Sequence, residues 1–193
     1  MAVKPEGTLL RKADYEVRTV PLATCQEKVA RYHYAKTGSN TATFRHGLFL
    51  RSQPETCVGI AWWIPPTKSA ALANYPKNWR AVLVLSRLAV DPGVPKNAAS
   101  FLIMQSVALI RQDFRWEYLL TYADEWQGHS GAIYKATNWD SLGKTTPEAT
   151  WVDSAGRMVS RKAGPHTRTR AEMESLGYKM IGRFSRHRFG MKL

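Results

Sequence analysis

The stretch that decides the fold is Arg80-Ala-Val-Leu-Val-Leu-Ser-Arg-Leu-Ala-Val-Asp-Pro-Gly-Val-Pro-Lys-Asn-Ala-Ala-Ser100, which continues as Phe101-Leu-Ile-Met-Gln-Ser-Val-Ala-Leu-Ile-Arg-Gln112. Residues 80–90 predict a strand, because their Val and Leu side chains suit a pleated, half-buried surface. Asp91-Pro-Gly-Val-Pro95 predicts a turn, and Asn97 predicts the cap of a helix over residues 98–112. A strand, a tight turn and a helix in immediate succession indicate an α/β fold.

Further strand and helix patterns flank this unit on both sides. Thr24 and Glu27 have the spacing of a capping box, so a helix is expected over residues 25–34. Apolar side chains after Gly128 have the spacing of one helix face as far as Trp139. Beyond residue 141 most of the chain is expected to be loop. The other predicted elements are strands over residues 17–20, 47–53, 57–64, 117–122 and 178–184, a polar, Ala-rich loop with a helical turn over 67–78, and a short helix over 169–176.

The resulting order, β-β-β-α-β-α-β, resembles the N-acetyltransferase architecture. We therefore expect a single α/β (α+β) domain over residues 1–193, with a central mixed, mostly antiparallel sheet flanked by helices. In that architecture the turn after the third strand exposes backbone N–H groups that hold a cofactor pyrophosphate. Its usual Gln/Arg-x-x-Gly-x-Gly/Ala pattern is reduced here to small residues, Ala98 and Ser100. The turn, with Lys96 and Asn97, is thus either an acyl-coenzyme A site or a plain capped helix start.

The charge balance indicates an anionic partner. The chain has 28 Lys and Arg against 15 Asp and Glu, a formal net charge of +13, and each phosphate neutralised by such side chains releases counterions. A merely basic protein is one alternative. A membrane surface is a weaker one, because no apolar run approaches the ~20 residues of a spanning helix. Two distant cysteines, Cys25 and Cys57, exclude a zinc finger or a disulfide scaffold and fit a reducing cytoplasm.

Much of the positive charge lies near the carboxyl end of the sequence. Residues 144–193 hold 11 Lys and Arg against 4 Asp and Glu, a basic C-terminal extension within the same domain. Arginines two positions apart lie on one side of an extended segment, which predicts phosphate contacts, although solvated loops carry such pairs too. The residues expected to contact double-stranded DNA are Arg161, Lys162, Arg168, Arg170, Arg186 and Arg188. Most of the seven tryptophans are expected in the core, with some free to stack on an extruded base.

The run Tyr122-Ala-Asp-Glu-Trp-Gln-Gly-His-Ser-Gly-Ala-Ile-Tyr134 places titratable side chains at the end of a predicted strand, where α/β folds usually bind ligands. Asp124 and Tyr134 are the catalytic candidates, and a solvated strand end with a helix cap is the alternative. His33 and Tyr34 end the first predicted helix, where packing alone would also explain them. If that helix crosses the strand end and stops there, His33, Tyr34 and Asp124 can converge as ligands suited to iron.

Three of these segments together resemble the Mom family of phage Mu and its relatives, DNA-modification enzymes with an acetyltransferase-like fold. They are His33-Tyr34, Leu85-Ser-Arg-Leu-Ala-Val-Asp91 and Gly128-His-Ser-Gly-Ala-Ile-Tyr-Lys-Ala-Thr-Asn-Trp139, and the resemblance covers about residues 25–190. It implies a transferase that converts adenine N6 in DNA to a carbamoylmethyl form and so protects phage DNA from restriction in the host cytoplasm.

The resemblance also implies roles for particular residues. His33, Tyr34 and Asp124 would form the polar or metal-binding set, with Arg87 as an anion clamp at the cofactor and Tyr134 as an acidic or orienting hydroxyl. Transfer from acetyl-coenzyme A would give an amide, whereas the implied product has an N–CH2 bond, so a metal or another donor, such as an aminoacyl carrier, would have to contribute. A homodimer is one option for the assembly.

Two rival functions stay open on the sequence. One is an acyl-coenzyme A-dependent N-acetyltransferase that acts on a protein or small-molecule amine, and it would have no need of the basic C-terminal residues. The other is a non-enzymatic DNA-binding, anti-restriction protein, which would bind DNA with a steep salt dependence and leave the composition of the DNA unchanged.

Overall fold

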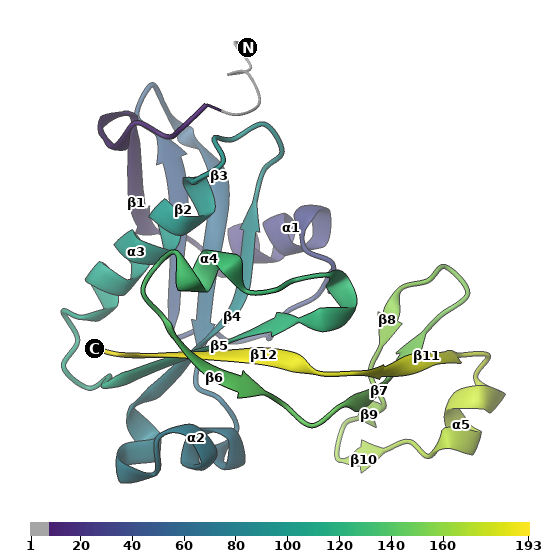
Figure 1. The fold of residues 1–193 in the computed structure, drawn as a ribbon. Coiled ribbons are helices and arrows are strands. Elements are labelled where there is room, and N and C mark those ends of the chain that lie inside the picture. The colour runs from purple at the N-terminus through teal and green to yellow at the C-terminus, as the bar shows by residue number, and fades with distance from the viewer. Residues whose placement is uncertain (1–7) are drawn as a thin grey trace.

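The computed structural model describes residues 8–193 and is built around one seven-stranded sheet (Figure 1). The strand order is β1-β2-β3-β4-β5-β12-β6, and each neighbouring pair is antiparallel except β4 and β5. The predicted mixed, mostly antiparallel sheet is therefore confirmed. Its strands are β1 (Tyr15–Thr19), β2 (Phe44–Leu50), β3 (Gln53–Ile64), β4 (Val82–Val90), β5 (Tyr118–Asp124), β6 (Asp140–Lys144) and β12 (Arg186–Lys192).

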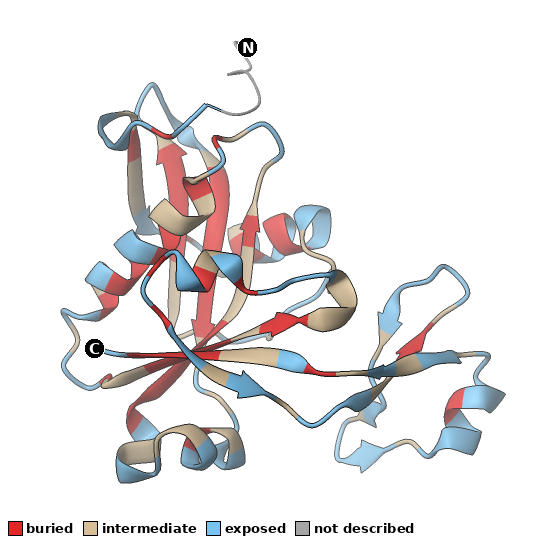
Figure 2. Cartoon of the chain, in the orientation of Figure 1, coloured by how far each residue is buried: buried red, intermediate tan, exposed pale blue. Residues whose placement is uncertain are grey.

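Two helices cover opposite faces of this sheet. α3 (Ala98–Ile110) packs against β1 to β4, and α1 (Leu22–Tyr32) packs against β2 to β4. Trp62 and Trp63 of β3 are both fully buried, because successive side chains of a strand point to opposite faces. Trp63 joins the larger core beneath α3, whereas Trp62 joins the core beneath α1. The buried residues accordingly concentrate in strands β2 to β5 (Figure 2).

The strand–turn–helix unit forms where its residues predict it. β4 runs into a turn in which Gly93 has a φ of +82°, and α3 follows directly after Asn97. The carboxamide of Asn97 does not cap the helix, however. Its Oδ1 atom accepts the backbone N–H of Leu10 at 2.6 Å, which ties the amino-terminal segment to the start of α3.

The parallel strands β4 and β5 separate halfway along their length. Their register pairs Val82 to Leu85 with Tyr118 to Thr121. Beyond these residues β4 continues beside β3 as far as Val90, and β5 continues beside β12 as far as Asp124. The divergence opens the sheet at the carboxyl ends of two neighbouring strands, which is where open α/β sheets usually bind their ligands.

Residues 145–185 form a small lobe that projects from the main body (Figure 1). We call it the C-terminal lobe. It holds a three-stranded sheet in the order β11-β7-β8 and a two-stranded ribbon of β9 and β10. Its elements are β7 (Glu148–Val152), β8 (Met158–Val159), β9 (Lys162–Ala163), β10 (His166–Thr167), α5 (Arg170–Ser175) and β11 (Lys179–Phe184).

The loop prediction for the basic region is therefore wrong in two respects. The segment between residues 145 and 168 forms short strands, and the chain after the lobe returns as β12 between β5 and β6. β12 was missed because its basic residues conceal an alternation in which Phe189 and Met191 point into the core. The predicted short helix and the strand before residue 184 do form, and Thr169 and Glu172 complete a capping box at the helix.

Three helix predictions need correction. α1 begins at Leu22 after Pro21, so Thr24 lies inside the helix and caps nothing. α4 is short (Ala132–Lys135), because Asn138 adopts a φ of +62° and turns the chain before Trp139. The helical turn expected within the loop over residues 67–78 is longer than predicted, and forms α2 (Lys68–Asn74) and the 3-10 helix η2 (Pro76–Ala81). Between residues 8 and 193 there is no helix of the length and apolarity needed to cross a membrane.

Candidate active site

Asp124 is the last residue of β5 and is almost fully buried, with 8% of its surface exposed. Its Oδ1 atom accepts the backbone N–H of Trp126 at 3.3 Å and so caps the 3-10 helix η3 (Glu125–Gln127). Gly128 ends η3 in the left-handed region, with a φ of +71°. Asp124 also lines a cavity between the main body and the C-terminal lobe.

Gly131 brings the next loop close to β12. It has a φ of +74°, and a Cβ atom at this position would lie 2.1 Å from the ring of Phe189. The close approach sends the chain into α4 with Tyr134 buried against Phe189 and Trp139. Burial raises the pKa of the Tyr134 phenol, so this hydroxyl keeps its proton at neutral pH.

His33 and Tyr34 follow the end of α1, which stops at Tyr32. His33 is in extended conformation, its ring stacks on Tyr34 with a centroid distance of 4.4 Å, and its Nδ1 atom accepts the N–H of Ala35 at 3.0 Å. Burial, helped by the positive charge of Arg87, lowers the pKa of His33 to about 4. The imidazole is therefore neutral at physiological pH, with its proton on Nε2.

Tyr34 links this segment to the strand end. Burial, followed by the negative charge of Asp124, raises the pKa of Tyr34 to about 12. The phenol of Tyr34 therefore stays protonated beside a buried carboxylate. Because α1 ends before His33, the side chains of His33 and Tyr34 are not held about 100° apart as on a continuous helix. This was the condition for both of them to face Asp124.

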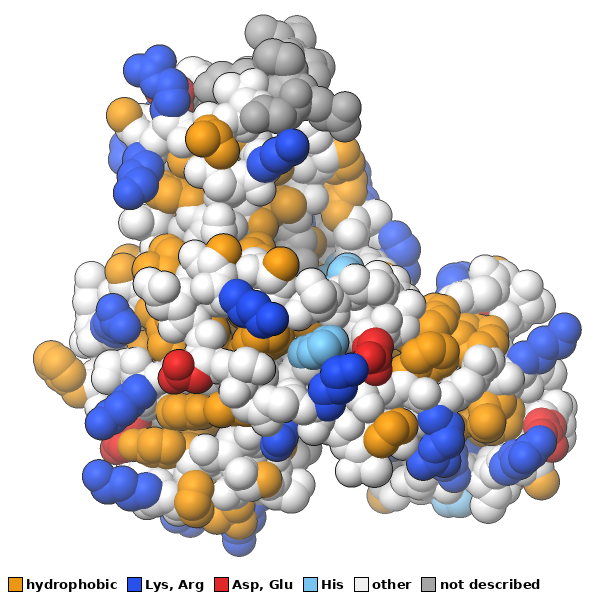
Figure 3. All heavy atoms as spheres, in the orientation of Figure 1, with side chains coloured by type: hydrophobic (Ala, Val, Ile, Leu, Met, Phe, Trp, Pro, Cys, Tyr) orange, Lys and Arg blue, Asp and Glu red, His pale blue; other side chains and the backbone are white. Residues whose placement is uncertain are grey.

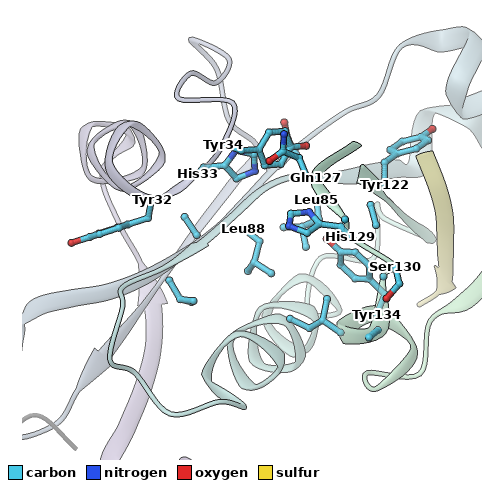
Figure 4. A pocket seen from close by; sticks show the side chains of 18 residues that line it. Tyr32, His33, Tyr34, Leu85, Leu88, Tyr122, Gln127, His129, Ser130 and Tyr134 are labelled. Atoms are coloured by element: carbon cyan, nitrogen blue, oxygen red, sulfur yellow. The ribbon is translucent and has the colours of Figure 1, made fainter. Parts of the chain in front are cut away.

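A first cavity of about 550 Å³ lies between the diverging halves of β4 and β5. Its walls come from the end of α1, the second half of β4, the end of β5 and the loop through Gly128 into α4. Figure 4 shows His33 and Tyr34 on one side of it, His129 near the middle and Tyr134 deeper on the opposite side. Among the described residues that line it there is no Lys, Arg, Asp or Glu.

A second cavity of about 870 Å³ lies between the main body and the C-terminal lobe. Asp124 lines this cavity and not the first one, whereas Tyr122 lines both. Lys and Arg side chains are spread over the body and the lobe (Figure 3), and several belong to this lining. The charged residues of the lining are Arg87, Arg161, Lys162, Arg183 and Arg186 with the acids Asp124 and Glu148.

The predicted DNA contacts divide into two groups. Arg161, Lys162 and Arg186 line the second cavity. Of the others, Arg170 is paired with Glu174 at 2.7 Å on the outside of the lobe, and Arg188 donates to the carbonyl of Leu142 at 2.7 Å. Arg168 is half-buried on the lobe and donates to the carbonyl of Ser160 at 3.4 Å. All six stay predictions.

The predicted cofactor turn does not border the first cavity. None of Lys96, Asn97, Ala98 and Ser100 lines it, Ala98 is fully buried, and Asn97 is engaged by Leu10. Asp91 places a carboxylate at the start of this turn, where Lys28 holds both of its oxygens at 2.7 Å. Lys28 neutralises this carboxylate, and the side chain of Asn97 does not cap the start of α3, so the turn stays a predicted cofactor site.

Arg87, which was expected to contact the cofactor, also lies outside the lining of the first cavity. It lines the second cavity rather than the first, and its guanidinium donates to the carbonyls of Thr37 at 2.8 Å and Ser86 at 2.6 Å. The positive charge of Arg87 helps to lower the pKa of His33 and opposes the rise in the pKa of Tyr34. No other cation has a larger effect on the pKa of either side chain.

The metal prediction is not supported. Across residues 8–193 there is no group of three or more His, Cys, Asp and Glu side chains that could hold a metal ion. His33 uses one ring nitrogen on the backbone of Ala35, and the acid on the same side is Asp124 alone. Iron is therefore not assigned to these residues.

Two lining residues of the second cavity were missed by reasoning from sequence, Glu148 and Phe184. They face each other across the pairing of β7 with β11. The run Arg183-Phe-Ser-Arg186, in which an aromatic ring stands between two arginines, was the available signal. This run could be assigned to a cavity only once the lobe was known, because its strand pairs with β7 about 30 residues earlier in the chain.

Sheet, helices and diverging strands define an N-acetyltransferase-like fold. The chain is similar to spermidine N-acetyltransferase from Vibrio cholerae, solved with CoA and spermine (TM-score 0.57, 9% identity, 94% of this chain and 96% of that one). It is also similar to YncA, a putative acetyltransferase from Salmonella typhimurium solved with acetyl-CoA (TM-score 0.56, 8% identity, 93% and 94%). At such identities the likeness concerns the fold alone.

The family follows from the sequence comparison. The chain belongs to the Mom protein family, whose model matches residues 14–191. The methylcarbamoylase Mom of Escherichia phage Mu is a distant relative, 24% identical over 160 residues. That match covers 80% of this chain but only 64% of the length of the phage Mu protein.

Proposed function

We propose that this protein transfers a carbamoylmethyl group to N6 of adenine in DNA. The observation that carries the proposal is the buried carboxylate of Asp124, beside the protonated phenol of Tyr34, between an uncharged cavity and a cation-lined one. The phage Mu relative is named a methylcarbamoylase, after a group with the same atoms as carbamoylmethyl. The net charge of +13 favours a polyanionic acceptor.

The acceptor nitrogen needs help from a base. The lone pair of adenine N6 is delocalised into the ring, so the amine becomes a nucleophile as it loses its proton. In the proposed step the N6–CH2 bond forms, the bond between that CH2 carbon and the leaving group of the donor breaks, and the N6 proton passes to Asp124. A buried carboxylate held by one backbone N–H keeps accepting capacity for this proton.

Tyr34 and His33 supply neutral donors on the other side of the same centre. The phenol of Tyr34 keeps its proton because its pKa is raised to about 12, and the imidazole of His33 is neutral because its pKa is lowered to about 4. Both can therefore donate a hydrogen bond to a leaving group or carbonyl oxygen without changing their own charge. Their stacking at 4.4 Å fixes the two rings relative to each other.

We assign the group that is transferred to the first cavity. None of the residues predicted to hold a cofactor pyrophosphate lines this cavity. The described lining of the first cavity carries no Lys or Arg to hold a phosphate. An uncharged amide such as the carbamoylmethyl group suits this lining of tyrosines, histidines and backbone amides, and the carrier of that group is left open.

The test is mass spectrometry of nucleosides from cells that express this chain. The proposal predicts a new deoxyadenosine species with the mass of the carbamoylmethyl product. An acetyl adduct in its place would support a plain acetyltransferase. Unchanged deoxyadenosine in cells whose DNA is nevertheless bound by the protein would support a non-enzymatic binder.

A further inference from the structure

We infer that the second cavity receives one adenine nucleotide turned out of the DNA duplex, with its N6 amino group at Asp124. The inference rests on the proposed function and adds to it the place where the acceptor binds. A base inside a duplex cannot bring N6 to a buried carboxylate, so an enzyme acting there must accept a nucleotide that has left the stack. Asp124 is reached from the second cavity and not from the first.

The walls of the second cavity suit a planar base. Phe184 of β11 lines it from the lobe, and Tyr122 of β5 lines it from the body, and both rings are partly exposed. Aromatic rings on both sides of a slot are what an unpaired base stacks on. The volume of about 870 Å³ is within the range of sites for ligands of nucleotide size.

The charges of the second cavity suit the sugar-phosphate backbone. Arg161, Lys162 and Arg183 are exposed on the lobe side of the lining, and neither Arg161 nor Arg183 has a carboxylate among its hydrogen-bond partners, which are the carbonyls of Arg168 and Pro147. These cations lie at the entrance, whereas Asp124 lies buried at the strand end. A nucleotide would thus enter with phosphate outward and base inward.

The lobe is held at a fixed distance from Asp124 by the neighbouring acid. The carboxylate of Glu125 accepts the Lys144 ammonium at 2.6 Å and the backbone N–H of Ser185 at 3.3 Å, and the N–H of Glu125 donates to the Ser185 carbonyl at 3.3 Å. Lys144 and Ser185 belong to the two segments that join the lobe to the body. Glu125 is therefore a positioning residue that keeps the cavity walls in place.

Photocrosslinking locates the base directly. The probe is a DNA duplex that carries 8-azidodeoxyadenosine at single positions, irradiated with the full-length protein and digested for peptide mapping. The inference predicts adducts within residues 148–162 or 183–186. Adducts confined to residues 32–34 or 127–134, which border the first cavity, would overturn it, and so would the lack of adducts in both sets.

A matched pair of phenylalanine variants tests the stacking. Phe184→Leu should weaken binding of the same duplex about tenfold, because an aromatic face is replaced by an aliphatic one of similar size. Phe114→Leu, which changes a ring that is 93% exposed on the turn after α3, should bind like the wild type. Equal affinities for both variants would overturn the inference.

Nucleoside mass spectrometry separates failure of the inference from failure of the function. If deoxyadenosine is modified in cells while the crosslinks fall in the first cavity, the function stands and the assignment of the cavity is wrong. If the crosslinks fall in the second cavity while no modified nucleoside forms, the base site stands and the reaction is wrong.

Discussion

The two cavities share the end of β5 but differ in almost every chemical property. The first is smaller and its described lining has no ionised carboxylate, ammonium or guanidinium group, whereas the second is lined by five cations and two acids. The first is formed within the main sheet, and the second exists only because the C-terminal lobe stands against the body. The main sheet thus supplies one site, and the C-terminal lobe completes a second site that differs from it in charge.

This contrast suggests how an acetyltransferase-like fold can acquire a polymer as its acceptor. The opening between β4 and β5 is a feature of the main sheet, and it needs no lobe. A polyanion requires a wide basic surface, and residues 144–193 add 11 Lys and Arg against 4 acids. Tyr34 lines the first cavity, Asp124 lines the second and Tyr122 lines both, so the chemistry is expected to depend on both cavities.

The largest effect is expected from the carboxylate at the junction. Asp124→Asn keeps the Oδ1 atom that caps η3 but removes the base, so adenine modification should fall about 10³-fold while the fold is retained. The measurement is modified deoxyadenosine per total deoxyadenosine in co-expressing cells. Asp113→Asn, on the turn before β5, is the matched control and should modify DNA normally. Full modification of DNA by Asp124→Asn would show that the Asp124 carboxylate is not the base.

A smaller loss is expected at the phenol on the other side of the junction. Tyr34→Phe keeps the stack on His33 but removes the hydroxyl, and modification should fall roughly 10²-fold. Tyr178→Phe, in the lobe and outside both cavities, is the control. Because the pKa of Tyr34 is raised to about 12, the wild-type rate should show no ionisation of this phenol between pH 7 and 9. A rate that falls with loss of a proton in that range would contradict the role of a neutral donor.

A third prediction concerns a buried histidine of the core, which affects stability and lines neither cavity. His46 is buried, its Nδ1 is hydrogen-bonded to the Ser106 hydroxyl at 2.6 Å, and that hydroxyl accepts the Trp63 indole N–H at 2.7 Å. Burial lowers the pKa of His46 from 6.5 to about 4, so the unfolded state takes up a proton first as the pH falls. The stability that this neutral histidine contributes is complete above pH 6.5 and is lost as the pH falls toward 4.

The corresponding measurement is urea unfolding at pH 7 and pH 5. The wild type should lose about 2 kcal/mol of unfolding free energy between these values on account of His46. His46→Gln, whatever its stability at pH 7, should lose less on acidification by a similar amount. An unchanged difference between the two pH values would show that His46 is not the titrating group.

The smallest effect is expected at the entrance of the second cavity. Replacing Arg161 and Arg183 together by Gln should reduce the slope of log K against log salt by about two, with a modest loss of affinity for DNA. Arg115→Gln, far from the lobe and already near Asp113, should leave the slope unchanged. Fluorescence anisotropy over a salt series provides the slopes, and equal slopes for all three proteins would place the DNA elsewhere.

The parts of the structure that sequence could predict are those set by neighbouring residues. The strand, turn and helix over residues 80–112 follow from local composition, and Asp124 could be placed because a buried strand leads directly to it. The approach of Tyr34 to Asp124 was predictable only on the condition that α1 ends at Tyr32, which the structure satisfies.

The remaining parts depend on contacts between distant segments. β12 pairs with β5, more than 60 residues earlier in the chain, and β11 pairs with β7 across the lobe. No local pattern specifies such partners, so Phe184 and Glu148 could not be assigned to a cavity. The helix cap at Asn97 failed for a similar reason, since Leu10 competes for its side chain from the amino-terminal segment.

The central claim is that DNA binds in the second cavity and the transferred group in the first. It is tested most directly by measuring DNA affinity in variants whose larger side chain fills one cavity or the other. Leu88→Trp places a larger ring in the first cavity, into which Leu88 points (Figure 4), and Thr150→Trp does so in the second. With both variants folded by circular dichroism, Leu88→Trp should bind duplex DNA like the wild type but modify none of it, whereas Thr150→Trp should bind about tenfold more weakly. Wild-type affinity in Thr150→Trp, with weakened binding in Leu88→Trp, would contradict the assignment of DNA to the second cavity.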